Sequence, residues 1–177
     1  MLARSRGGVN EGGTSSGRQV ENVSFGRKMR LATLDGRPFM PKLPLTGHCL
    51  CGSVRYEITK PLLFAGYCHC TRCQRRTGTA AAASARIAPG SLRVLSGQEL
   101  IKAWRPPDGF AKIFCSNCGG ALWSQSREDP EVISVRMGTF DADPGVRPSY
   151  RAYVAYAAPW EPIPDDGLPR FPEARKG

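Results

Sequence analysis

No apolar run in this 177-residue chain approaches the roughly 18 residues that a membrane-spanning helix requires. The N-terminus also lacks an apolar segment ahead of a small-residue cleavage site, which a secretion signal would show. There are seven cysteines and no eighth to complete a set of disulfides. We therefore expect a soluble, cytoplasmic protein whose thiols are reduced and bind metal.

Acidic residues are scarce, with 15 Asp and Glu against 25 Lys and Arg, and the net charge is +10. The excess is spread along the chain, because residues 1–40 hold only seven of the Lys and Arg. The basic residues are not interleaved with aromatic ones, as they would be on a base-stacking surface. Nucleic-acid binding is therefore not expected, and small anionic substrates would suit the charge equally well.

Long amphipathic helices and internal repeats are also missing. From Leu45 onwards, short runs of alternating apolar and polar residues are bounded by glycine and proline, which is typical of half-buried strands. Strands are predicted over residues 51–58, 62–67, 79–87, 92–95, 99–104, 110–114, 121–124, 132–137 and 151–156. Within 79–87, four alanines favour a helix by propensity, but the segment lacks a polar face and we predict a strand. The expected fold is all-β, with two packed antiparallel sheets.

Three segments are predicted along the chain. Residues 1–44 form a disordered tail, because a composition rich in Gly, Ser and Arg cannot bury enough apolar surface to offset its ordering entropy. Residues 45–172 form the zinc-binding domain, and residues 173–177 form a C-terminal tail. Two alternatives for the first segment are a transit peptide, which its acidic residues disfavour, and a start site at Met29 or Met40.

The cysteines form three clusters and carry the functional prediction. They are Cys49-x-Cys51, Cys68-x-Cys70-x-x-Cys73 and Cys115-x-x-Cys118. A structural zinc takes four protein ligands, whereas a catalytic zinc typically takes three and keeps one position open. The seven thiols therefore divide into a closed four-cysteine site, made by the two outer pairs some 64 residues apart, and an open three-cysteine site.

Each of these sites has an alternative interpretation. The last cysteine pair could be a redox pair, but no alternating strand and helix pattern surrounds it, and the first pair needs partners. The triple cluster could be closed by His69 or His48, although both alternate away from the neighbouring cysteines in an extended chain. Arg72, Arg75 and Arg76 follow the triple cluster and would suit an anionic thiol substrate, or they could simply be solvated.

Several segments between about residues 45 and 172 match one family in order. They are Gly47-His-Cys-Leu-Cys-Gly-Ser-Val-Arg-Tyr-Glu, Tyr67-Cys-His-Cys-Thr-Arg-Cys-Gln-Arg-Arg-Thr-Gly, Phe114-Cys-Ser-Asn-Cys-Gly-Gly, Met137-Gly-Thr-Phe-Asp, and Pro159-Trp160 followed by Asp165-Asp-Gly-Leu-Pro. In these segments the chain resembles the glutathione-dependent formaldehyde-activating enzymes, also called the centromere protein V family. One position departs from the family pattern, because Arg151 stands where many members have a histidine.

The resemblance implies an all-β fold called the β-tent, with two zinc ions. The structural ion would be held by residues matching Cys49, Cys51, Cys115 and Cys118, and the catalytic ion by residues matching Cys68, Cys70 and Cys73. The implied activity is that of a zinc-dependent carbon-sulfur lyase acting on S-hydroxymethylglutathione, which joins glutathione and formaldehyde in the synthetic direction. The three catalytic cysteines would then be ligands rather than nucleophiles. Alternatives are a non-catalytic zinc-binding interaction module of the same fold, and a lyase for another thiol and aldehyde pair.

Overall fold

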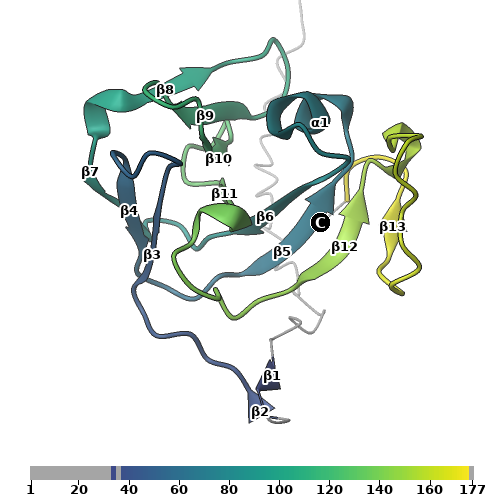
Figure 1. The fold of residues 1–177 in the computed structure, drawn as a ribbon, viewed down its shortest axis with the longest axis horizontal. Coiled ribbons are helices and arrows are strands. Elements are labelled where there is room, and N and C mark those ends of the chain that lie inside the picture. The colour runs from purple at the N-terminus through teal and green to yellow at the C-terminus, as the bar shows by residue number, and fades with distance from the viewer. Residues whose placement is uncertain (1–32, 35–36, 176–177) are drawn as a thin grey trace, which may run out of the picture.

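The computed structural model describes residues 33–34 and 37–175 (Figure 1). Most of the predicted N-terminal tail lies outside these ranges and stays a prediction. The strands are β1 (Thr33–Leu34), β2 (Arg37–Pro38), β3 (Leu45–His48), β4 (Arg55–Ile58), β5 (Phe64–Cys68), β6 (Ala82–Arg86), β7 (Leu92–Ser96), β8 (Ile101–Trp104), β9 (Ala111–Cys115), β10 (Ala121–Gln125), β11 (Ile133–Arg136), β12 (Pro148–Ala152) and β13 (Arg170–Phe171). The helices are α1 (Thr71–Thr77) and the short 3-10 turns η1 (Gln98–Leu100), η2 (Met137–Thr139) and η3 (Val154–Tyr156). None of them is long and apolar enough to cross a membrane.

Two sheets form the body of the domain. The large sheet has eight strands in the order β13-β12-β5-β6-β11-β10-β9-β8, and the small sheet has three in the order β3-β4-β7. The prediction of an all-β fold with two sheets is confirmed. The expectation of purely antiparallel pairing needs correction at β12, which runs parallel to both β5 and β13. A parallel pair needs a long crossover, and the chain between β5 and β12 provides one.

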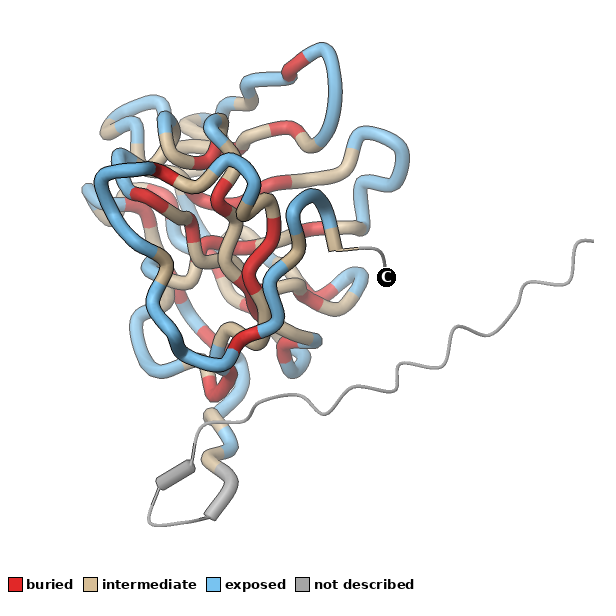
Figure 2. Tube along the Cα trace, turned by 90° about the vertical axis from the view of Figure 1, so that its right-hand side faces the viewer, coloured by how far each residue is buried: buried red, intermediate tan, exposed pale blue. Residues whose placement is uncertain are grey.

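The hydrophobic core lies between the two sheets. In β4, Tyr56 and Ile58 are fully buried, as the two-residue period of a strand with one face inward requires. The facing side of the large sheet contributes Ile113 from β9 and Val135 from β11. The ring of Tyr56 meets that of Trp123 edge-on, with 5.9 Å between the centroids. Figure 2 shows the buried stretches inside the domain, with exposed loops around them.

The second face of the large sheet is largely polar. Side chains alternate along a strand, and the residues between the core positions therefore point away from the core. One cross-strand row consists of Gly66, Ser84 and Arg136. A longer row consists of Phe64, Arg86, Ser134, Ser124 and Lys112. This face forms the floor of the pocket described below.

Several local structures differ from the sequence prediction, whereas the strand predicted over 79–87 is confirmed as β6. The short strands β1, β2, β3 and β13 were not predicted, and the first residues of the predicted strand 99–104 lie in η1. Helix α1 was not predicted. It begins after Cys70, whose sulfur accepts a hydrogen bond from the N–H of Cys73 (3.4 Å), and it ends at Gly78 with φ of 67°. The strand predicted over 151–156 ends at Ala152, because Tyr153 adopts a φ of 59° and starts η3.

Residues 173–175, assigned to a C-terminal tail by the sequence, contact the domain. The N–H of Tyr153 donates to the carbonyl of Glu173 (3.0 Å), and the hydroxyl of Tyr156 donates to its carboxylate (2.9 Å). These contacts bring the end of the chain to the rim of the pocket, which Arg175 helps to line.

Candidate metal centres and active-site pocket

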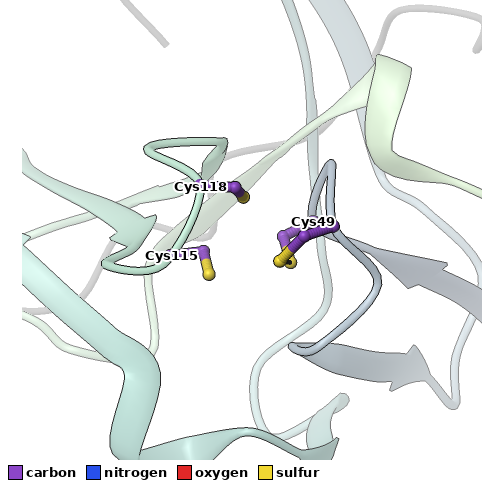
Figure 3. Close-up of side chains that lie close together, drawn as sticks. Cys49, Cys115 and Cys118 are labelled. Carbon is purple, nitrogen blue, oxygen red and sulfur yellow. Dashed lines mark hydrogen bonds between the residues drawn. The ribbon is translucent and has the colours of Figure 1, made fainter.

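The first cysteine group links the two sheets. Cys49 and Cys51 follow β3 of the small sheet, whereas Cys115 ends β9 of the large sheet and Cys118 lies in the turn to β10. The four sulfur atoms lie within 4.8 Å of one another. Figure 3 shows the labelled cysteines on two loops that face each other. Sulfur atoms about 2.3 Å from a tetrahedral zinc would be roughly 3.8 Å apart, and the group therefore fits such an ion.

The turns around this group stabilise thiolates. The side-chain amide of Asn117 donates to the sulfur of Cys51 (3.4 Å). Gly119, which follows the second cysteine of its pair, adopts a positive φ of 70°, a conformation that glycine tolerates. Hydrogen bonds with Ser53 lower the pKa of the Cys51 thiol to about 5, whereas burial raises the pKa of Cys115 to about 11. A coordinated metal ion would hold all four thiols deprotonated despite these differences.

The second cysteine group is built around the start of α1. Cys68 ends β5, Cys70 caps the helix and Cys73 lies in its first turn. Their sulfur atoms also lie within 4.8 Å of one another, and no histidine or carboxylate among the described residues joins them as a fourth ligand. The helix explains the spacing, because a cap residue and the residue three positions later share one side of the first turn. A catalytic zinc typically has three protein ligands and one open position, and these three thiols could supply such a ligand set.

These three thiols share negative charge unequally. Hydrogen bonds from Cys68 and Cys70, together with the positive charges of Arg136 and Lys112, lower the pKa of the Cys73 thiol to about 2. The same contacts with Cys70 and Cys73 raise the pKa of Cys68. One thiolate is therefore favoured before any metal binds, and a divalent cation would stabilise all three.

Neither histidine joins a cysteine group. His48 interacts through Nδ1 with the carbonyl of Cys49 (2.6 Å) and through Nε2 with Asp141 (3.3 Å). His69 is buried, and its Nε2 lies 3.2 Å from Nη1 of Arg151. Burial and the charge of Arg151 lower the pKa of His69, which keeps the ring neutral.

Arg151, the residue that departs from the family pattern, is buried beside the second group. Its guanidinium donates to Asp166 (2.7 and 3.2 Å) and stacks over Tyr67 at 4.5 Å from the ring centroid. With the neighbouring His69, it ties β12 to β5 and to the segment after residue 164. Its guanidinium is therefore engaged within the protein.

A pocket of about 1190 Å³ opens beside the second cysteine group. The polar face of the large sheet forms its floor, and α1 and the C-terminal segment form its walls. It is lined by seven basic residues and one acidic residue: Arg72, Arg75, Arg76, Arg86, Lys112, Arg136, Arg175 and Asp108. Such an excess of positive charge around a concave surface attracts anionic ligands. Sequence spacing predicted only the three arginines of α1.

The basic residues differ in how they are paired. Arg72 forms an ion pair with Asp108 (2.9 Å) and stacks on Trp104, whereas no described residue pairs with the exposed Arg75. Arg136 is buried on the floor and donates from Nη1 to Ser84 (2.8 Å). Its Nε and Nη2 are also buried and have no partner among the described groups. No carboxylate among the described residues pairs with this positive charge on the floor.

Arg76 anchors α1 to the large sheet, and its replacement is expected to destabilise the domain. Its Nη2 donates to the carbonyls of Ile113 (2.5 Å) and Trp123 (3.1 Å). Removal would take a charged donor from both part-buried carbonyls, and a hydrogen bond to a charged group contributes about 1.5–3 kcal/mol. We expect Arg76→Met to lower the free energy of unfolding by about 3 kcal/mol, measured by urea denaturation of the zinc-loaded protein.

Arg75→Met is the matched control, because Arg75 lies on the same helix and is exposed. It should change the free energy of unfolding by no more than about 0.5 kcal/mol. Equal stability of the two variants would show that the contacts of Arg76 do not hold the helix.

Comparison with known proteins gives three matches. A family model described as "Glutathione-dependent formaldehyde-activating enzyme" matches residues 44–156, more than half of the chain. A Halomonas elongata protein named "Putative glutathione-dependent formaldehyde-activating enzyme" is 28% identical over 105 residues, which are 56% of this chain and 67% of that protein. A crystal structure of a Rhodobacter sphaeroides protein is 27% identical, with a TM-score of 0.47, and the match covers 71% of this chain and 98% of that one.

Proposed function

Because the chain belongs to the glutathione-dependent formaldehyde-activating enzyme family, we propose that it is a zinc-dependent carbon-sulfur lyase acting on S-hydroxymethylglutathione. In the synthetic direction it would join glutathione and formaldehyde. The observation that carries this proposal is a group of three thiols that opens onto a cationic pocket and lacks a fourth ligand among the described residues. The name of the Halomonas elongata relative supports the same activity.

The two cysteine groups would have different roles. Cys49, Cys51, Cys115 and Cys118 would hold a structural zinc ion, because four thiolates complete its coordination. Cys68, Cys70 and Cys73 would hold the catalytic ion. When bound, that ion would supply a site where a substrate thiol stays deprotonated near neutral pH. The three cysteines act as ligands and are not consumed in the reaction.

The rest of the pocket would bind and orient the reactants. Its basic residues attract the carboxylates of glutathione, which places the sulfur near the three cysteines. In the synthetic direction the thiol sulfur bonds to the carbonyl carbon of formaldehyde, the thiol loses its proton and the carbonyl oxygen gains one. Tyr153 lines the same pocket, and burial and the nearby thiolates raise its pKa. Its phenol therefore stays neutral and can donate a hydrogen bond to that oxygen.

The test is to measure exchange between formaldehyde and S-hydroxymethylglutathione by NMR on protein with a known zinc content. We expect two zinc ions per chain and exchange that is faster than in buffer with free zinc. Zinc-loaded protein that binds glutathione without accelerating exchange would favour a non-catalytic module. Acceleration with a different thiol alone would keep the chemistry and change the substrate.

A further inference from the structure

The pocket extends from the three thiols to a group of side chains at the far end of β5 and β6. Cys68 pairs with Ala82 at one end of these strands, and Phe64 pairs with Arg86 at the other. Four strand residues of about 3.3 Å each separate the two ends by roughly 13 Å. We call this group the arginine-aromatic subsite; its members, which all line the pocket, are Phe64, Arg86, Phe110, Tyr150 and Arg175.

Aromatic rings hold both guanidinium groups of the subsite. The Cζ of Arg175 lies 4.8 Å from the ring centroids of Phe64 and Tyr150. The Cζ of Arg86 lies 5.9 Å from the centroid of Phe64 and 5.6 Å from that of Phe110. Stacking uses the flat face of a guanidinium and leaves its edge, which carries the N–H groups, for a planar anion.

No carboxylate in the described part of the chain pairs with either arginine of the subsite. The Nε of Arg86 is buried and has no hydrogen-bond partner among the described groups. A half-buried charge without a partner is unfavourable, and a ligand that brings an anion would relieve this cost. Arg72 and Arg76, by contrast, already have partners within the protein.

The distance from the thiols selects the part of a ligand that can reach the subsite. In glutathione, eight bonds link the sulfur to the carboxylate carbon of the γ-glutamyl end, about 10 Å when extended. Six bonds link it to the glycine carboxylate, roughly 7.5 Å. The longer arm is closer in length to the roughly 13 Å between the backbones of the two strand ends, and it is therefore the better match to the gap.

We propose that the arginine-aromatic subsite binds a carboxylate carried about 10 Å from the substrate thiol, such as that of the γ-glutamyl end of glutathione. This inference rests on the proposed function and names the part of the thiol substrate that the pocket recognises. Arg86 and Arg175 are binding residues at the end of the pocket remote from the chemistry.

The test is calorimetric binding of four probes to the full, zinc-loaded chain: glutathione, S-methylglutathione, γ-glutamylcysteine and cysteinylglycine. Arg86→Met and Arg175→Met should each weaken glutathione binding about tenfold, the loss expected for one charge-assisted hydrogen bond. The same loss should appear with S-methylglutathione, which lacks a free thiol, and with γ-glutamylcysteine. It should disappear with cysteinylglycine, which lacks the γ-glutamyl arm.

Arg93→Met is the control, because Arg93 lies on the small sheet, where it is exposed and pairs with Glu57 (3.5 Å). Because Arg175 lies near the end of the chain, we expect Arg175→Met to fold. The test therefore stays valid even if Arg86→Met does not fold. If the wild type binds glutathione and Arg175→Met binds it with the same affinity, the subsite proposal is overturned and the proposed function stands. If no thiol binds the wild type, both fail. A loss with cysteinylglycine that is absent with γ-glutamylcysteine would overturn the proposal and assign the glycine carboxylate to the subsite.

Discussion

Replacing Cys115 by serine is expected to prevent the domain from folding. This cysteine belongs to the group that links the turn after β3 in the small sheet to the turn after β9 in the large sheet. Structural zinc contributes about 10–16 kcal/mol to folding in small zinc domains, whereas the total stability of a domain is only about 5–15 kcal/mol. Loss of a ligand, together with a buried hydroxyl in its place, should therefore exceed the stability available. Circular dichroism and zinc per chain measure the result.

Ser116→Ala provides the control for this variant, because Ser116 lies in the same turn and is exposed. It should fold and bind zinc like the wild type. A Cys115→Ser protein that keeps the wild-type spectrum and melting temperature would show that the two sheets do not depend on this metal centre.

The second large effect is expected from Cys70→Ser, which should abolish turnover and leave the fold intact. Serine is among the preferred residues at a helix N-cap, and it can accept the hydrogen bond from the N–H of Cys73 in place of the sulfur. Helix α1 should therefore form as before. Replacing a residue that hydrogen-bonds to a metal ligand already lowers metal affinity or activity about 10–100-fold. Loss of the ligand itself should therefore reduce the exchange rate by more than about a hundredfold. Zinc per chain should fall from two to one.

Cys70→Ala separates the two roles of this residue, because alanine removes the cap as well as the metal ligand. It should lose the same zinc and activity but be about 1 kcal/mol less stable than Cys70→Ser. Collapse of Cys70→Ser would make the triple cluster a structural site. Full activity in that variant would place the chemistry elsewhere.

Local patterns in the sequence were sufficient to predict much of the fold. Alternation of apolar and polar residues identified the strands from β4 to β12, including β6, where the lack of a polar face outweighed the helix propensity of its alanines. The short strands β1, β2, β3 and β13 were not predicted. Helix α1 was missed because seven residues are too few to show a helical period. Its only signals are the residues at its ends, namely Cys70 at an N-cap position and Gly78 immediately after it.

The candidate site was also predicted only in part. Cysteine spacing predicted both groups that the structure brings together. The triple cluster is local, whereas the two outer pairs were assigned to each other because seven thiols divide into four and three. The floor of the pocket was not predicted, since Arg86, Lys112 and Arg136 come from three different strands. Each occupies an ordinary polar position of its own strand, and only the pairing order of the strands places them on one face.

The place of β12 and β13 in the large sheet also has a consequence for how the protein is made. The first cysteine group is complete once residue 118 has been synthesised. Strands β12 and β13, which complete the large sheet next to β5, are finished only at residue 171. At typical translation rates the delay is roughly 3–10 s. During that interval a growing chain can already bring the four cysteines of the first group together, while the three thiols beside β5 still lack one wall of their pocket. Those thiols are then open to competing metals and to oxidation until the last strands dock.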